Sequence, residues 1–95
     1  MTLRADLNLI AQQIPHASRV LDLGCGDGSL LQHLINDHDC TGTGVEIDPE
    51  KVLAAIVSGV PVMELDVDAD LSLFATGSYD TVVLSRTIQT LRLPD

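Results

Sequence analysis

The sequence predicts an α/β protein built on a parallel sheet. Two hydrophobic periodicities alternate along the chain, one typical of helices and one of buried strands, and a glycine-rich turn follows the first strand-like run. Strands that alternate with helices of about ten residues are joined by right-handed crossovers and lie parallel. With 95 residues, 45% of them apolar, we expect one small core and a single domain over residues 1–95.

The first half of the chain contains the clearest periodicities. A helix is predicted over residues 3–14, where apolar residues recur at the i, i+3, i+4, i+7 spacing of one helix face. These residues are Leu7, Ile10, Ala11 and Ile14. A strand at about 19–23 then ends at a glycine cluster, and a second helix follows with its own apolar stripe. The next strand is predicted at 42–47.

A third helix and two further strands complete the predicted elements. Asp48 suits an N-cap and Pro49 a first helical residue, so the third helix begins there. Strands are predicted at about 60–65 and 79–84, and the acidic connection between them, 66–78, has room for a short helix. The continuous apolar centre of the last strand indicates burial on both faces.

Charge and composition limit the classes of partner. The net charge is −9, from 14 acidic and 5 basic residues, and such a surface repels phosphate backbones and anionic lipid. We therefore expect neither a nucleic-acid nor a membrane partner. No apolar run reaches the roughly 20 residues of a membrane span, and the first residues lack a signal-peptide pattern. Two isolated cysteines, Cys25 and Cys40, fit a reducing compartment, so a cytoplasmic location is expected.

The turn after the first strand carries the most chemical information. Gly24, Gly26 and Gly28 form G-x-G-x-G, where the backbone turns sharply and a ligand can approach closely. Glu46 lies 20 positions after Gly26, at the end of the second strand, where a carboxylate can accept both hydroxyls of a ribose. Asp66 ends the third predicted strand, where it can accept a hydrogen bond from an adenine amino group. These strand ends share one sheet edge, which indicates an adenosine-containing ligand.

Two residues of this turn separate the classes of adenosine ligand. A carboxylate at Asp27 would face a pyrophosphate at short range, and Ser29 stands where the dinucleotide fingerprint has its third glycine. S-adenosylmethionine has no phosphate and carries positive sulfonium and ammonium groups, beside which Asp22 and Asp27 are favourable. The residues favour S-adenosylmethionine or S-adenosylhomocysteine, with an NAD-binding Rossmann module as the alternative.

The longer pattern resembles a known family. VLDLGCGDG resembles the first motif of class I S-adenosylmethionine-dependent methyltransferases, and GVEIDPE resembles their acidic second-strand motif. Together with the N-terminal R-x-D-L-x-x-I and the segment LSRTIQTLRLPD, the series resembles the bacterial MetW family of methionine biosynthesis over nearly the whole chain. The resemblance implies a Rossmann-like class I methyltransferase fold, a three-layer α/β/α arrangement with a parallel sheet in strand order 3-2-1-4, whose C-terminal half is missing here.

The resemblance also implies roles for particular residues. Asp22, Gly24 and Gly26 would hold the methionine end of the cofactor and Glu46 the ribose. Asp66 and Val67 would flank the adenine. The complete set of candidate cofactor-binding residues is Asp22, Gly24, Cys25, Gly26, Asp27, Gly28, Glu46, Ile47, Asp66, Val67 and Ser85. No residue is assigned a catalytic role, and no metal site is expected.

Other reactive side chains have simpler interpretations. Cys25 lies within the glycine loop, but no histidine is placed by sequence to activate it, so we expect a small side chain packed under the loop. Ser85, Arg86 and Gln89 follow the last strand, where methyltransferases position substrate. They either face a methyl acceptor or begin a surface helix.

Three functions are compatible with these observations. The first is a methyltransferase, in which the protein mainly orients the acceptor for in-line attack. The second is a non-catalytic, S-adenosylmethionine-sensing partner of homoserine O-acetyltransferase, the enzyme with which the family is linked, and the third is the NAD-binding module. Since the chain ends soon after its fourth predicted strand, we expect a fragment that is inactive by itself. Its fourth strand is then expected to form an open edge through which the chain self-associates.

Overall fold

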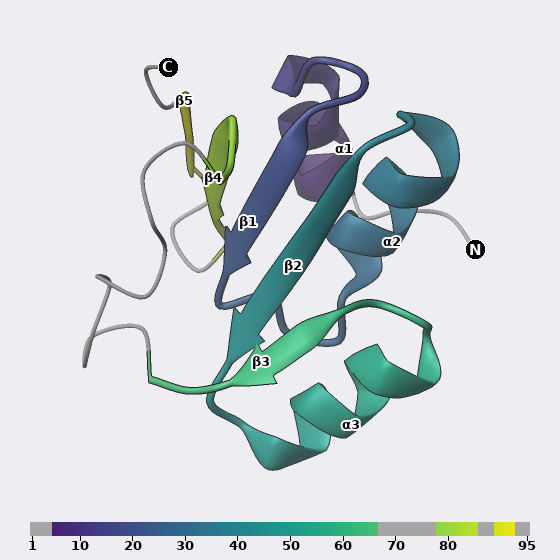
Figure 1. The fold of residues 1–95 in the computed structure, drawn as a ribbon. Helices are drawn as coiled ribbons and strands as arrows, with labels where there is room; N and C mark the ends of the chain where they lie inside the picture. The colour runs from purple at the N-terminus through teal and green to yellow at the C-terminus, as the bar shows by residue number, and fades with distance from the viewer. Residues whose placement is uncertain (1–4, 67–77, 86–88, 93–95) are drawn as a thin grey trace.

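A five-stranded sheet organises the computed structural model, which describes residues 5–66, 78–85 and 89–92 (Figure 1). In chain order the elements are α1 (Ala5–Gln13), β1 (Arg19–Leu23), α2 (Ser29–Asp37), β2 (Thr41–Glu46), α3 (Pro49–Val57), β3 (Val62–Glu64), β4 (Thr81–Leu84) and β5 (Gln89–Arg92). Within these ranges, no helix has the length and apolarity that crossing a bilayer requires.

The sheet has the order β3-β2-β1-β4-β5, with β1 at its centre. The pairs β1–β2, β1–β4 and β2–β3 are parallel, so the predicted order 3-2-1-4 is confirmed. An ion pair fastens the start of this parallel core, because the guanidinium of Arg19 donates to both carboxylate oxygens of Asp80 just before β4, at 3.1 and 2.8 Å. Such long-range pairing sets the register in which the carboxyl ends of the strands meet.

The prediction of an open edge at the fourth strand is wrong. β5 pairs antiparallel with β4, from Leu84 opposite Gln89 to Thr81 opposite Arg92. The surface helix considered after Ser85 is wrong for the same reason, since Gln89 begins a strand. The backbone N–H and C=O groups along β4 need partners, and the next segment of the chain supplies them. Self-association through an unpaired β4 edge therefore loses its basis.

The third strand begins later than predicted, because a proline interrupts its hydrogen bonding to the neighbouring strand. β3 begins at Val62 rather than at residue 60, because Pro61 has no N–H to donate and contributes only its carbonyl, which accepts from Gly44 N at 2.8 Å. Val60 is buried against the helices instead. The short helix considered within 66–78 lies almost wholly outside the described residues, at 67–77.

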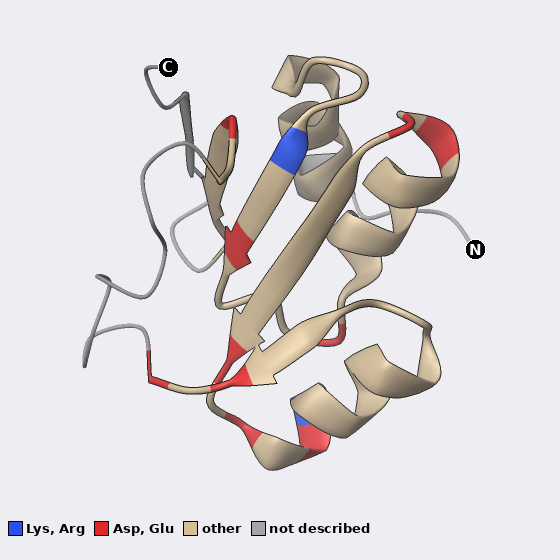
Figure 2. Ribbon diagram, in the orientation of Figure 1, with Lys and Arg blue, Asp and Glu red and all other residues tan. Residues whose placement is uncertain are grey.

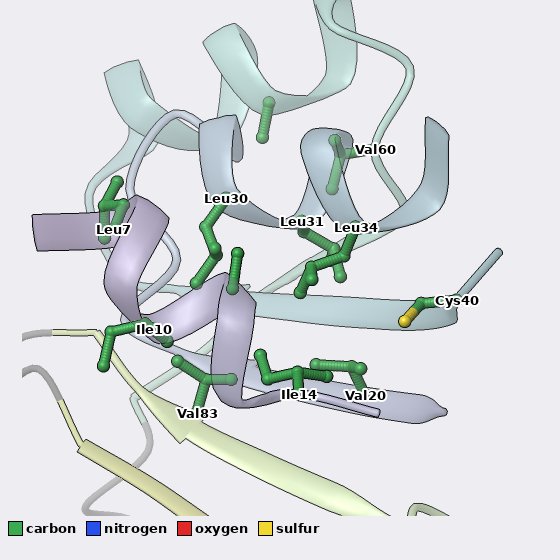
Figure 3. Packing of buried hydrophobic residues seen from close by; sticks show 12 residues of the cluster. Leu7, Ile10, Ile14, Val20, Leu30, Leu31, Leu34, Cys40, Val60 and Val83 are labelled. Carbon is green, nitrogen blue, oxygen red and sulfur yellow. The ribbon is translucent and has the colours of Figure 1, made fainter. Parts of the chain in front are cut away.

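The helices α1, α2 and α3 contribute to one apolar cluster on a single face of the sheet (Figure 3). The apolar face predicted for the first helix is its buried face, and α2 adds three leucines. The cluster comprises Leu7, Ile10, Ala11, Ile14, Val20, Leu30, Leu31, Leu34, Cys40, Ala55, Val60 and Val83. Leu31 and Leu34 are fully buried, which stabilises the fold by about 1.5–3 kcal/mol for each side chain. On the other face, Leu21, Val45 and Val82 form a second, smaller cluster.

Glycines in β2 let the helix layer lie close to the sheet. A Cβ at Gly42 would come within 2.9 Å of Leu31 Cδ1 in α2 and 2.5 Å of the Val20 carbonyl oxygen. A Cβ at Gly44 would come within 2.5 Å of Cys25 Sγ. The alternate small residues of β2 are therefore a packing requirement of the turn between β1 and α2 and of α2 itself.

Replacing Gly44 should overpack this contact. We expect Gly44→Ala to lower the free energy of unfolding by about 1–3 kcal/mol, because Cys25 lies on backbone that cannot move aside easily. Urea unfolding followed by circular dichroism measures the change. Thr43→Ala, one position earlier in the same strand, is the control and should cost less; equal losses for the two variants would contradict the packing argument.

Candidate functional site

The carboxyl ends of the parallel strands meet at one edge of the sheet, where the glycine loop (residues 24–28) joins β1 to α2. Figure 2 shows acidic residues at the ends of β1, β2 and β3 along this edge. In open α/β sheets ligands bind outside this edge, beside the strands from which connections leave in opposite directions. The edge is therefore the candidate site.

Backbone hydrogen bonds hold the glycine loop against β2. Gly24 N and Cys25 N both donate to the Val45 carbonyl oxygen, at 2.8 and 3.1 Å. Gly28, the N-cap of α2, has φ 83, and a Cβ there would lie 3.1 Å from Val60 Cγ2. Both the left-handed backbone and the close contact require glycine at this position.

Gly26 is the open point of the loop. Its φ is +60, and a Cβ built there would meet no heavy atom within 4 Å. Its N–H donates to Glu46 Oε1 at 2.8 Å. The backbone at Gly26 can thus be approached closely from outside, as a bound ligand would require.

Glu46 joins the glycine loop to the start of α3. Its side chain is 4% exposed, and besides Gly26 it accepts from Ile47 N and Asp48 N, both at 3.0 Å on Oε2. Three backbone donors hold the carboxylate in one orientation at the end of β2. The sequence predicted these residues at one edge, and the structure brings Gly26 and Glu46 into direct contact.

Asp22 is a buried acid with one oxygen engaged. It is 1% exposed at the end of β1, and Ser85 Oγ donates to its Oδ1 at 2.5 Å. Its Oδ2 has no hydrogen-bond partner among the residues described. Burial raises the pKa of Asp22 to about 7; the Ser85 hydrogen bond lowers it and the charge of Glu46 raises it further. A buried acid with a pKa near neutrality is typical of functional sites.

The glycine loop itself carries two side chains, Asp27 and Cys25, and they lie in different environments. Asp27 is exposed, and its Oδ1 accepts from Ser29 N at 3.0 Å and Ser29 Oγ at 2.6 Å, which places a negative charge at the start of α2. Cys25 is buried and packs against Gly44, as expected for a side chain under the loop. Burial, together with the charges of Asp22 and Glu46, raises the pKa of the Cys25 thiol to about 12, so this group is no nucleophile at neutral pH.

The remaining candidates lie farther out on the same edge. Ile47 follows β2 directly and is 47% exposed. Asp66 is exposed, two residues past the end of β3, and Val67 lies outside the described residues. In the described ranges, no group of three or more His, Cys, Asp or Glu side chains is arranged to hold a metal ion.

Sequence reasoning missed the residues that support the loop from beneath. Gly44 makes room for Cys25, and the Val45 carbonyl accepts two loop N–H groups. The signal was available, since Gly42 and Gly44 alternate in the second strand and therefore face the same helix. The Ser85–Asp22 contact was also missed because it depends on the pairing of β1 with β4, whose residues are about 60 positions apart in the chain.

Solved structures share this architecture. Coclaurine N-methyltransferase, in a crystal structure with N-methylheliamine and SAH, has a TM-score of 0.71 and 26% identity, over 84% of this chain and 25% of that one. A protein of the NADB-Rossmann superfamily from Streptococcus agalactiae has a TM-score of 0.75 and 20% identity, over 88% of this chain and 40% of that one. The sheet order and the glycine loop thus define the Rossmann-like fold of class I methyltransferases.

Sequence comparison identifies the family within this class. The model of methionine biosynthesis protein MetW matches residues 4–95. The bifunctional methionine biosynthesis protein MetXA/MetW of Rhodopirellula baltica is 36% identical over an alignment of 97 positions that covers 94% of this chain and 16% of that protein. The chain belongs to the MetW family, and it spans about a sixth of the length of this curated relative.

The raised pKa of Asp22 predicts a stability that falls with rising pH. The folded state keeps the Asp22 proton up to about pH 7, whereas the unfolded chain loses it near 3.8, so the folded state binds more protons between these values. We expect the free energy of unfolding to be larger at pH 5 than at pH 7.5, by on the order of 2 kcal/mol. Urea unfolding across this range measures it.

Two variants isolate the group responsible for this pH dependence. Asp22→Asn removes the titration and should flatten the profile between pH 5 and 7.5. Asp80→Asn is the control, because Arg19 lowers the pKa of Asp80 to about 2 and its titration lies below this window. A slope that persists in Asp22→Asn would show that another group is responsible.

Proposed function

We propose that this chain binds S-adenosylmethionine or S-adenosylhomocysteine at the carboxyl edge of the sheet, against the glycine loop. The observation that carries the proposal is the buried Asp22 carboxyl group, whose Oδ2 lacks a partner in the described part of the chain. A buried oxygen without a partner is costly, and the cofactor's ammonium group is the donor it needs. Because Asp22 must be ionised for this pairing, binding near neutral pH releases a proton.

The adenosine half of the cofactor suits the ends of β2 and β3. The Glu46 carboxylate, held in one orientation by backbone N–H groups, is suited to the two ribose hydroxyls. The half-exposed side chain of Ile47 offers an apolar surface to the adenine ring. Asp66 and Val67 complete the adenine side in this proposal. The loop residues Gly24, Cys25, Gly26 and Gly28 contribute backbone rather than side chains.

NAD is the alternative ligand, and Asp27 weighs against it. Its carboxylate accepts the Ser29 N–H at the start of α2, so a negative charge already lies at the helix end that would face a pyrophosphate. A cationic ligand without phosphate meets no such repulsion. The charge at the loop therefore supports the sulfonium cofactor.

Methyl transfer is proposed for a longer protein that contains this chain. The chain corresponds to 25% of the length of coclaurine N-methyltransferase, so acceptor binding is outside what its own residues explain. When bound, S-adenosylmethionine supplies an electrophilic methyl group on a positively charged sulfur. The contribution of this chain is to orient that group. In-line transfer depends on this orientation more than on a catalytic side chain. Ser85 acts by holding Asp22 in position.

A second candidate function is control of an acetyltransferase in methionine synthesis. The observation that favours it is the Rhodopirellula baltica relative, whose name joins MetXA and MetW in one protein. The family resemblance links MetW to homoserine O-acetyltransferase, and we propose this enzyme as the partner. A cofactor-binding chain can control a partner if the bound and free states differ in their affinity for it.

Gly26→Ala should block cofactor binding without a steric clash inside the fold. The methyl group would project into the open space beside the loop, where a bound cofactor approaches the backbone. We expect calorimetric titration to show S-adenosylmethionine and S-adenosylhomocysteine binding to the wild type, no NAD binding, and at least tenfold weaker binding to Gly26→Ala. Glu46→Ala should lose binding as well.

Gly59→Ala is the matched control for Gly26→Ala. Gly59 has φ +83 and equally open surroundings, so both variants carry the same left-handed strain, about 1–2 kcal/mol. Gly59 lies at the far end of α3, so the Gly59→Ala variant should bind the cofactor as the wild type does. Equal loss in both variants would attribute the effect to instability, and no binding by the folded wild-type chain would contradict the cofactor proposal for this chain.

The acetyltransferase proposal predicts an effect on that enzyme's rate. Adding the full-length protein to homoserine O-acetyltransferase from the same organism should change its steady-state activity, and saturating S-adenosylmethionine should alter the change. Unchanged activity in every ligand state would exclude this function. Transfer of a labelled methyl group to a component of a cell extract would favour the methyltransferase instead.

A further inference from the structure

The outer side of α3 carries an apolar stripe that the fold does not use. Leu53, Ile56 and Val57 are 63, 57 and 80% exposed. Their spacing of three and four residues places them together on one side of the helix. Val52 and Ala55 of the same helix are buried against the rest of the fold, so α3 is apolar on two sides. A helix that is apolar beyond its core-facing side is expected to bury the remainder elsewhere.

The stripe also lies within a long uncharged run of the sequence. Residues 52–63 contain no charged side chain, in a chain with 19 charged residues and a net charge of −9. Lys51 and Glu64 border this run, Glu50 lies one residue before Lys51, and all three are exposed. A contact centred on the stripe would desolvate no charge at its middle, and depletion of charge at the centre is typical of protein interfaces.

We propose that the α3 stripe is the centre of the docking surface for the acetyltransferase partner, which meets it with an apolar patch that has a basic margin. This inference rests on the partner proposed above. A second copy of this chain would bring the same Glu50 and Glu64 and the same net charge of −9, so like charges would oppose that pairing. A partner with basic groups opposite Glu50 and Glu64 is attracted instead.

The stripe is connected to the cofactor site through α3 itself. Glu46 Oε2 accepts from Asp48 N, and Asp48 Oδ1 accepts from Glu50 N as the N-cap of α3. At the other end of the glycine loop, a Cβ on Gly28 would lie 3.3 Å from Ala55 Cβ. A nine-residue helix is thus held at the site by its first turn and by its inner side, and carries the stripe on its outer side. A change in how Glu46 or the loop is held can shift the docking surface as a rigid element.

The size of the stripe fits the centre of a larger contact. A stable interface buries roughly 800 Å² on each partner, more than three side chains supply, so surrounding polar residues must complete it. In the Rhodopirellula baltica relative the family's unit and MetXA share one name and one chain, and such linkage raises the effective concentration of one unit beside the other.

The test replaces the stripe and a matched exposed leucine. Leu53→Ser with Val57→Ser should weaken binding to homoserine O-acetyltransferase of the same organism at least tenfold, measured by calorimetry or sedimentation. Leu9→Ser on α1, where Leu9 is 61% exposed, should leave the affinity within about twofold, since a lone surface leucine is no hot spot. Retained binding of S-adenosylhomocysteine by the stripe variant shows that it is folded.

Each other outcome overturns part of the inference. Unchanged affinity in the stripe variant, or an equal loss in Leu9→Ser, would exclude α3 as the docking surface. A wild-type dimer that the stripe variant separates would make a second copy the occupant. If the wild type does not bind the acetyltransferase, the partner and the docking surface both fail, whereas the titration with S-adenosylhomocysteine decides the cofactor proposal separately.

Discussion

Close packing of the glycine loop on β2 is the constraint on which the rest of the structure depends. The Val45 carbonyl accepts two loop N–H groups, Glu46 accepts a third from Gly26, and Gly44 has no side chain because Cys25 occupies that space. These contacts set where α2 begins and which backbone groups face outward. Any larger residue at Gly44 would lift the loop and move the candidate site with it.

The candidate site contains a buried acid whose charged form is unfavourable in the folded protein. Asp22 is buried with Oδ2 lacking a partner among the described residues, and its charged form is disfavoured because it lies away from water and near Glu46. A core built only for stability would place an apolar side chain there. A cation supplied by a ligand removes the penalty, so the same feature that lowers stability at neutral pH favours binding.

The three helices differ in how much of their apolar surface the fold buries. α1 and α2 bury their apolar faces and close the core (Figure 3). In α3, the first turn is tied to Glu46 through Asp48, whereas the outer stripe remains exposed. One short helix therefore links a polar site to an apolar surface, which is the connection that the proposed control of a partner requires.

The sequence by itself determined the α/β class and the residues at the carboxyl edge, because periodicity and the G-x-G-x-G spacing are local signals, and the order of the first four strands followed from the family resemblance. It did not determine that Glu46 contacts Gly26 N, that Ser85 holds Asp22, or that Gln89 begins a strand along β4. The tertiary structure decided these points. Burial and hydrogen-bond partners depend on which distant segments meet, and a pattern within one segment carries no information about that meeting.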